Sequence, residues 1–202
     1  MKHIPTLIAS LALAATATAG TTASVEPAGK GKACCVTPTP ACPNMLSYSY
    51  LEAGYIRLDP DAQGVQTQDG GYLDASWEVA PHFLIDGSAT IFDDSDQFTV
   101  GIGTYIPLCS AFHLTARTGY SYYDADGADS QNEWYISPGF RAMLGCHLEL
   151  WGKVYINVDS DETEVSYGGG LTYHFCPHTG LTVGAAGSSD GWSLQTGLRY
   201  QF

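Results

Sequence analysis

Basic residues and long apolar runs are both scarce in this chain. Lysine and arginine together number 8 of 202 residues. After residue 19, no stretch is apolar for long enough to form a membrane-spanning helix, which needs about 20 such residues. Helical spanning is therefore excluded beyond the N-terminus. Spanning by strands is not excluded, because strands that alternate polar and apolar residues have a mean hydropathy near zero, and the mean hydropathy here is −0.05.

Catalytic and metal-binding motifs are also missing. The chain contains no HExxH or CxxC sequence, the patterns of zinc hydrolases and of paired redox or metal-binding cysteines. Its one GxSxG match, at residues 187–191, spans an acidic connection between two expected strands and not the strand-to-helix turn that this motif forms in serine hydrolases. A catalytic Ser–His or His–Asp pair is not expected at the acidic loops described below, because no histidine lies beside them to act as the base. We therefore expect neither an enzyme nor a bound cofactor. The alternative is a metal site of cysteines with the histidines beside the short turns, which are His82, His113, His147 and His178.

The first 45 residues show no strand alternation and divide into two segments. Residues 1–19 combine a basic start at Lys2, an apolar stretch and the sequence Ala17-Thr18-Ala19, which is typical of a cleaved secretory signal peptide. Residues 20–45 are rich in glycine, proline, alanine and threonine, and they predict an irregular tail.

Polar and apolar residues alternate from residue 46 to the end of the chain. In residues 192–202, for example, Leu194 and Leu198 share one face with aromatic residues, while Gln195 and Arg199 share the other, as in an amphipathic strand. We predict an all-β fold, a closed antiparallel up-and-down transmembrane barrel of ten strands. The alternative is eight strands, if 82–92 and 97–107 are misassigned. The ten expected strands are 47–58, 71–80, 82–92, 97–107, 111–123, 133–144, 147–158, 164–175, 179–187 and 191–202.

The ending Arg199-Tyr200-Gln201-Phe202 resembles the C-terminal assembly signal of bacterial outer-membrane β-barrel proteins. Together with the signal peptide and the repeated strands, residues 46–202 resemble the small barrels of the OmpA-like, OmpX-like and opacity-protein type. The resemblance implies a location in the outer membrane of a Gram-negative-type bacterium, with both termini in the periplasm. It further implies contact with outer-membrane lipid and lipopolysaccharide, help from the barrel-assembly machinery, and a monomer. No nucleic-acid partner is expected.

Two kinds of connection alternate between the expected strands. Those at 80–82, 108–111, 145–147 and 176–178 are short and contain no acidic residue, whereas those at 59–70, 93–96, 124–132, 159–163 and 188–190 are acidic. We place the acidic end outside the cell, because small outer-membrane barrels have short periplasmic turns. These loops also suit diffuse binding of Ca²⁺ or Mg²⁺, although they lack EF-hand spacing. With their strand ends they contain Asp59, Asp61, Asp69, Asp93, Asp94, Asp96, Asp124, Asp126, Asp129, Glu133, Asp159, Asp161, Glu162, Glu164 and Asp190.

Charged residues within the strands are expected to point into the lumen, because a lysine or arginine facing lipid costs about 2–4 kcal/mol near the midplane. Five acids and four bases nearly balance there, which favours a plugged, salt-bridged lumen. A narrow passive pore for ions or small solutes is the alternative. A soluble ligand-binding barrel would need the inverse polarity. The nine charges are Glu52, Asp74, Glu78, Asp86, Arg117, Arg141, Glu149, Lys153 and Arg199.

Six cysteines form a second pattern at the short-turn end. Three lie in the tail and three lie in or beside short turns, and the tail must emerge at that same end because it precedes the first strand. In an oxidising compartment, we expect three disulfides that each join a tail cysteine to a turn cysteine. Other pairings stay open, including bonds between molecules. The candidates are Cys34, Cys35 and Cys42 in the tail, and Cys109, Cys146 and Cys176 in the turns.

Overall fold

The computed structural model describes residues 46–60, 67–125, 130–158, 163–189 and 191–202. The predicted signal peptide, the tail and its cysteines Cys34, Cys35 and Cys42 lie outside these ranges. Within them, no helix is long and apolar enough to cross a membrane. The strands are β1 (Tyr50–Pro60), β2 (Gln68–Ala80), β3 (Phe83–Phe92), β4 (Ser95–Cys109), β5 (Phe112–Ala125), β6 (Gln131–Leu144), β7 (Leu148–Val158), β8 (Thr163–Cys176), β9 (Thr179–Ser188) and β10 (Gly191–Gln201).

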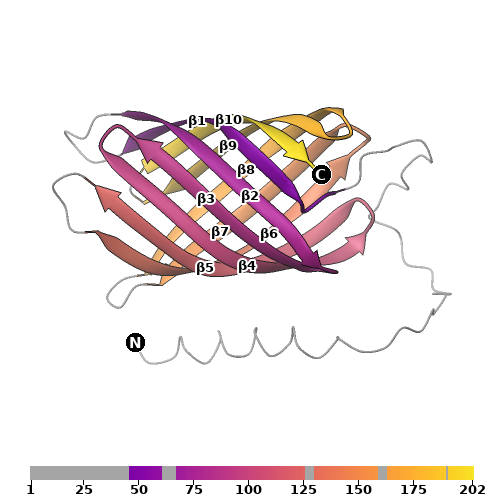
Figure 1. Cartoon of the computed structure of the whole chain (residues 1–202), viewed down its shortest axis with the longest axis horizontal. Coiled ribbons are helices and arrows are strands. Elements are labelled where there is room, and N and C mark those ends of the chain that lie inside the picture. Colours follow the sequence, from indigo (N-terminus) through magenta and orange to yellow (C-terminus); the bar gives the residue numbers. More distant parts are fainter. Residues whose placement is uncertain (1–45, 61–66, 126–129, 159–162, 190) are drawn as a thin grey trace. The chain divides into compact units, whose positions relative to one another are not determined.

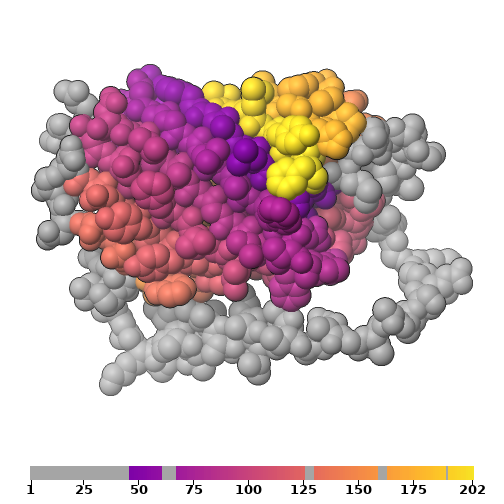
Figure 2. Space-filling view, viewed as in Figure 1, coloured from indigo at the N-terminus to yellow at the C-terminus, as the bar shows by residue number. Residues whose placement is uncertain are grey.

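The ten strands form one closed antiparallel barrel (Figure 1). Each strand pairs with its neighbours in sequence, and β1 pairs with β10 to close the ring. Figure 2 shows the same seam from outside, with the last strand in yellow against the first in indigo. The prediction of ten strands is therefore confirmed. The alternative of eight is wrong, because 82–92 and 97–107 correspond to the separate strands β3 and β4.

The two faces of the sheet differ in polarity. Every strand exposes large apolar side chains on its outer face; on β10, for example, Leu194 and Leu198 are 46% and 57% exposed. On the alternate positions of the same strand, Arg199 and Gln201 are buried. This exterior and interior are the inverse of those in a water-soluble barrel, and they match a barrel that has hydrocarbon outside.

Strand β1 has an outward arginine. Alternation places Arg57 on the apolar face unless the strand contains a bulge or Arg57 lies at the rim. The pairing of β1 with both neighbours runs without a register shift, so there is no bulge. Arg57 is exposed, pairs in register with Asp69 and lies near the end of β1 at Pro60. It therefore occupies the rim, where Tyr55 also donates a hydrogen bond to Asp69.

The end with the short connections, here called the short-turn end, contains local irregularities. The pairing register shifts between Glu78 and Ala80, between Pro107 and Cys109, and between His174 and Cys176. A bulge adds one residue to a strand, bends it and increases its twist. All three shifts lie beside a short turn, so this end of the barrel is bent more sharply than a regular ladder allows. The opposite end, which carries the longer acidic connections, is called the loop end below.

Candidate functional site

The polar interior contains the charges that alternation places there. Asp86 lines one cavity, of about 230 Å³. Glu78 accepts a hydrogen bond of 2.7 Å from the hydroxyl of Tyr105 near the short-turn end. The other seven line a smaller cavity of about 50 Å³, and they are Glu52, Asp74, Arg117, Arg141, Glu149, Lys153 and Arg199.

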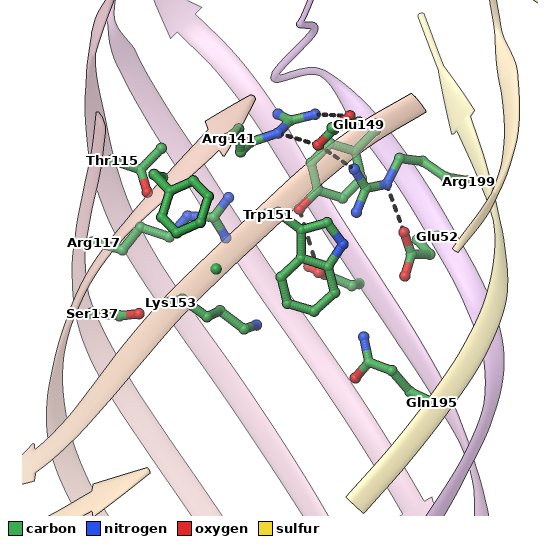
Figure 3. A pocket seen from close by; sticks show the side chains of 14 residues that line it. Glu52, Thr115, Arg117, Ser137, Arg141, Glu149, Trp151, Lys153, Gln195 and Arg199 are labelled. Carbon is green, nitrogen blue, oxygen red and sulfur yellow. Dashed lines mark hydrogen bonds and ion pairs between the residues drawn. The ribbon is translucent and has the colours of Figure 1, made fainter. Parts of the chain in front are cut away.

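Glu149 on β7 is the centre of a group of ion pairs near the short-turn end (Figure 3). Its carboxylate is fully buried. It accepts hydrogen bonds from Nε and Nη2 of Arg141 at 2.6 and 2.9 Å, and from Nη1 of Arg199 at 3.3 Å. Nε2 of His174 lies 3.2 Å from the second carboxylate oxygen. A bidentate guanidinium–carboxylate pair of this kind has a fixed geometry as well as charge attraction.

Arg199 connects Glu149 to a second buried carboxylate, that of Glu52. The two residues face each other across the β1–β10 seam, and Nε of Arg199 donates to Glu52 at 2.6 Å. The hydroxyls of Thr182 and Tyr72 also donate to Glu52, at 2.9 and 2.7 Å. Arg141, Glu149, Arg199 and Glu52 thus form a continuous chain of alternating charge, which we call the ion-pair layer.

The ion-pair layer is nearly inaccessible to water. Its two glutamates are 0% and 2% exposed, and both arginines are 6% exposed. Two positive and two negative groups cancel, so no net charge is buried. Because removing one partner of a buried pair leaves an uncompensated charge and costs about 3–5 kcal/mol, the four side chains hold one another in place.

The segment before β1 turns into the barrel and covers this layer. Tyr48 is 1% exposed and stacks on Tyr105 with ring centroids 4.0 Å apart. The guanidinium carbon of Arg141 lies 4.6 Å from the centre of the Tyr48 ring, and its Nη1 donates to the Ser47 carbonyl at 2.6 Å. Burial raises the pKa of Tyr48, so the phenol remains protonated and can bond to Nδ1 of His113, 3.1 Å away. The expected strand 47–58 is therefore wrong at its start, since residues 47–49 form an inward cap.

The larger cavity lies on the loop side of the ion-pair layer and is called the polar chamber. Its wall includes Asp74, Asp86, Arg117 and Lys153, which are two acids and two bases. Nη1 of Arg117 lies 3.5 Å from Oδ2 of Asp86. The Lys153 ammonium lies 3.2 Å from the Tyr155 hydroxyl, and it lies over the rings of Tyr155 and Trp151 at 4.8 and 5.5 Å.

Inward-facing aromatic residues are the part of this site that the sequence interpretation missed, because it placed the charged strand residues in the lumen and, in residues 192–202, aromatics on the opposite face. Trp151 lines both cavities. Its ring fits against Gly170 and Gly184, where an added Cβ would lie 2.6 and 2.8 Å from the indole. Tyr135 fits in the same way against Gly101 and Gly119. The signal was present in the alternation, because Trp151 lies between the inward residues Glu149 and Lys153 and shares their parity.

The turn cysteines differ from one another. Cys176 carries a free thiol, so the expected third bridge is not formed at this residue, and three tail-to-turn disulfides are wrong for this structure. Cys109 and Cys146 are not free. Their expected partners Cys34, Cys35 and Cys42 lie outside the described residues, so this pairing stays a prediction.

The C-terminal residues lie at the short-turn end beside the cap. Tyr200 and Phe202 are outward and exposed, and the Phe202 ring meets Trp77 edge-on at 5.8 Å between centroids. The Phe202 amide donates to the carbonyl of Ser49 at 3.1 Å. The apolar end of the chain is thus presented on the outer surface, and its role as an assembly signal stays a prediction.

Comparison with known proteins gives remote similarity only. No family model and no curated protein matches the chain. Similar solved structures include a KdgM porin (11% identity, 75% of this chain and 99% of that chain, TM-score 0.48). Ail of Yersinia pestis is 16% identical over 78% of this chain and 100% of that chain, with a TM-score of 0.38. OprG of Pseudomonas aeruginosa is 15% identical over 79% and 98%, with a TM-score of 0.41. These similarities are too distant to carry a conclusion, and the fold rests on the chain's own strand pairing.

Proposed function

We propose that the chain is an integral outer-membrane β-barrel without catalytic activity, whose lumen is plugged near the short-turn end. Its role is structural, or it depends on interactions of the acidic loops. The apolar exterior supports placement in a membrane, because a lipid-facing apolar band is the mark of such barrels. The short turns and both termini face the periplasm, and the acidic loops face outward. We further propose a monomer in contact with lipid and lipopolysaccharide, inserted by the barrel-assembly machinery that recognises Tyr200 and Phe202.

The observation that carries this proposal is the buried ion-pair layer beneath the Tyr48 cap. A barrel of about eight strands is just filled by its side chains, and ten strands leave only slightly more room. Here the added room at the short-turn end contains two guanidiniums, two carboxylates and the Tyr48 ring. Because these groups satisfy one another, water gains little by entering between them. The same contacts occupy both carboxylates, which supports a structural rather than catalytic use.

Conductance in planar lipid bilayers tests the closure. The purified protein is expected to give no stable current steps. Tyr48→Gly combined with Arg141→Ala removes the cap and one end of the ion-pair layer, so this variant is expected to conduct. The matched control is Tyr167→Gly combined with Leu198→Ala, two exposed outer-face residues, and it is expected to stay silent. A silent Tyr48/Arg141 variant would show that these groups do not close the bore.

A narrow passive pore is the second candidate. It is favoured by the position of the two cavities, which are neighbours because five polar or aromatic residues line both of them. Stable, reproducible steps from the unmodified protein would replace the plugged barrel with this pore. The shared residues are Asp74, Arg117, Trp151, Lys153 and Gln195.

A further inference from the structure

We propose that the Tyr48 cap responds to pH: it is seated while His113 is neutral and released when His113 gains a proton. The inference rests on the plugged barrel proposed above, because the cap covers the ion-pair layer, and it adds a regulated state to that barrel. Release exposes the short-turn side of the layer to water. Histidine ordinarily gains its charge near pH 6.5, so the cap responds to mild acidification.

The seated cap uses a neutral imidazole. The Tyr48 hydroxyl lies 3.1 Å from Nδ1 of His113, and both side chains are buried. Their rings stack on the Tyr105 ring, with centroids 4.0 and 5.3 Å away. Among the residues that the structure describes, the Tyr48 O–H has no other acceptor, so we assign it as the donor to Nδ1. A ring nitrogen that accepts a hydrogen bond carries no proton, so His113 is neutral in this state, with its hydrogen on Nε2.

A proton on His113 disturbs this arrangement in two ways. Nδ1 becomes a donor, so the phenol O–H that pointed at it loses its acceptor. The new charge is also unfavourable, because burial disfavours the charged form of a titratable group and a like charge lies close by. Arg141 pairs with His113 in register, and its guanidinium carbon lies 4.6 Å from the centre of the Tyr48 ring. The neutral form therefore stabilises the seated cap, and this stabilisation is lost as the pH falls through the histidine range.

Two further titratable groups face the same stack, from β2 and from the β2–β3 turn. Glu78 is an acid, but its carboxylate already accepts hydrogen bonds from the Tyr105 hydroxyl at 2.7 Å and from the His82 backbone amide at 3.2 Å. His82 is exposed, and its ring meets Tyr105 edge-on at 4.8 Å between centroids. Among the described residues, no three His, Cys, Asp or Glu side chains could hold a metal ion. Protonation of His82 adds positive charge beside the stack, so the charge around His113 becomes more positive as the pH falls.

The test measures how firmly the cap is seated, in the full-length protein reconstituted in lipid nanodiscs. The backbone amide of Glu78 donates to Oγ of Ser49 at 3.1 Å, so its hydrogen-exchange protection factor, measured by NMR, reports the cap directly. Between pH 7.5 and 5.0, after correction for the intrinsic pH dependence of exchange, this factor is expected to fall about tenfold, since linkage allows up to about tenfold per pH unit. The amide of Gly119, within β5, is the internal control and is expected to keep its protection.

Two variants connect the response to His113. His113→Asn keeps an acceptor oxygen for the Tyr48 hydroxyl but cannot gain a proton, so the protection of the Glu78 amide is expected to be the same at both pH values. His178→Asn is the matched control, because His178 is exposed at the same end and its Nδ1 lies 3.0 Å from the Gln201 carbonyl and not beside the cap. This control is expected to keep the full acid response. If His113→Asn fails to fold, His113→Gln supplies the neutral acceptor in its place.

Three results would overturn the inference. One is equal protection of the Glu78 amide at both pH values in the unmodified protein. A second is an acid response that persists in His113→Asn and is lost in His174→Asn, since this would move the sensor to the ion-pair layer, where Nε2 of His174 lies 3.2 Å from Glu149. The third is a transition midpoint below about pH 4.5, where carboxylates titrate. Current steps from the unmodified protein at neutral pH contradict the plug and leave the exchange result to decide the cap, so the two proposals fail separately.

Discussion

Replacing Glu149 by glutamine should be among the most destabilising single changes in this barrel. The carboxylate receives three guanidinium hydrogen bonds, at 2.6, 2.9 and 3.3 Å, and it lies 3.2 Å from His174. Glutamine is nearly the same size but neutral, and its amide group must point at a guanidinium. Arg141 is then left buried without its counter-charge, while Arg199 keeps Glu52.

The size of the effect follows from these contacts. Removing one partner of a buried pair costs about 3–5 kcal/mol. Glutamine retains one oxygen that can accept, so we expect about 3 kcal/mol of lost unfolding free energy, and about 5 kcal/mol for Glu149→Ala, which also leaves a void. Since folded proteins are stable by only about 5–15 kcal/mol, either loss is large.

Reversible urea unfolding in lipid vesicles measures this loss, with the midpoint compared at constant slope. The control is Glu164→Gln, a half-buried carboxylate at the loop end of β8, for which we expect less than ~1 kcal/mol. The double variant Glu149→Gln with Arg141→Met should recover part of the stability, because it removes the orphaned charge. A loss for Glu149→Gln equal to that for Glu164→Gln would refute the assignment of Glu149 as the centre of the layer.

Three other changes test separate parts of the structure. Gly119→Ala should destabilise by about 3 kcal/mol or more through overpacking, since an added Cβ would lie 2.2 Å from the Val100 carbonyl oxygen and 2.8 Å from the Tyr135 hydroxyl, whereas Gly168→Ala meets nothing nearer than 3.6 Å; equal unfolding midpoints would contradict this. Leu198→Arg should cost about 2–4 kcal/mol in the same assay if that outward residue faces lipid, and a neutral result would contradict the membrane placement. A maleimide should label Cys176 without reductant, and Cys109 and Cys146 only with it; peptide mass spectrometry that finds all three labelled at once would contradict the expected bridges.

The strand count and the inward charges could be predicted because alternation has only two outcomes for each residue. Within β10, for example, a single parity assigns Leu194 and Leu198 to one face and Arg199 to the other, and the structure has the same arrangement. Most strand bounds could also be predicted from the sequence, because glycine, proline and acidic clusters interrupt the alternation between strands. The position of Arg57 at a rim, one of the two options offered by the sequence, follows from the same reasoning.

Contacts inside the barrel could not be predicted in this way. Parity shows that Glu149 and Arg199 point inward, but their meeting depends on register and strand tilt, which involve residues 50 positions apart. The cap could not be predicted for a similar reason. Tyr48 has the same parity as Tyr50 and Glu52, so the sequence alone predicts that the strand begins before it. Trp151 is inward only because Gly170 and Gly184, on two other strands, leave space for its ring.

The position of Arg199 has a consequence for biogenesis. Its partners are Glu52 in the first strand and Glu149 in the seventh, so both of its ion pairs are formed together only when the last strand has paired with the first. In a sheet that has not closed, the Arg199 guanidinium lies on one edge and the Glu52 carboxylate on the other, and a sheet that lacks its final strand leaves Glu52 without this guanidinium. Charge neutralisation at the seam thus coincides with ring closure, so an incomplete barrel is less stable than a closed one by the loss of this buried ion pair.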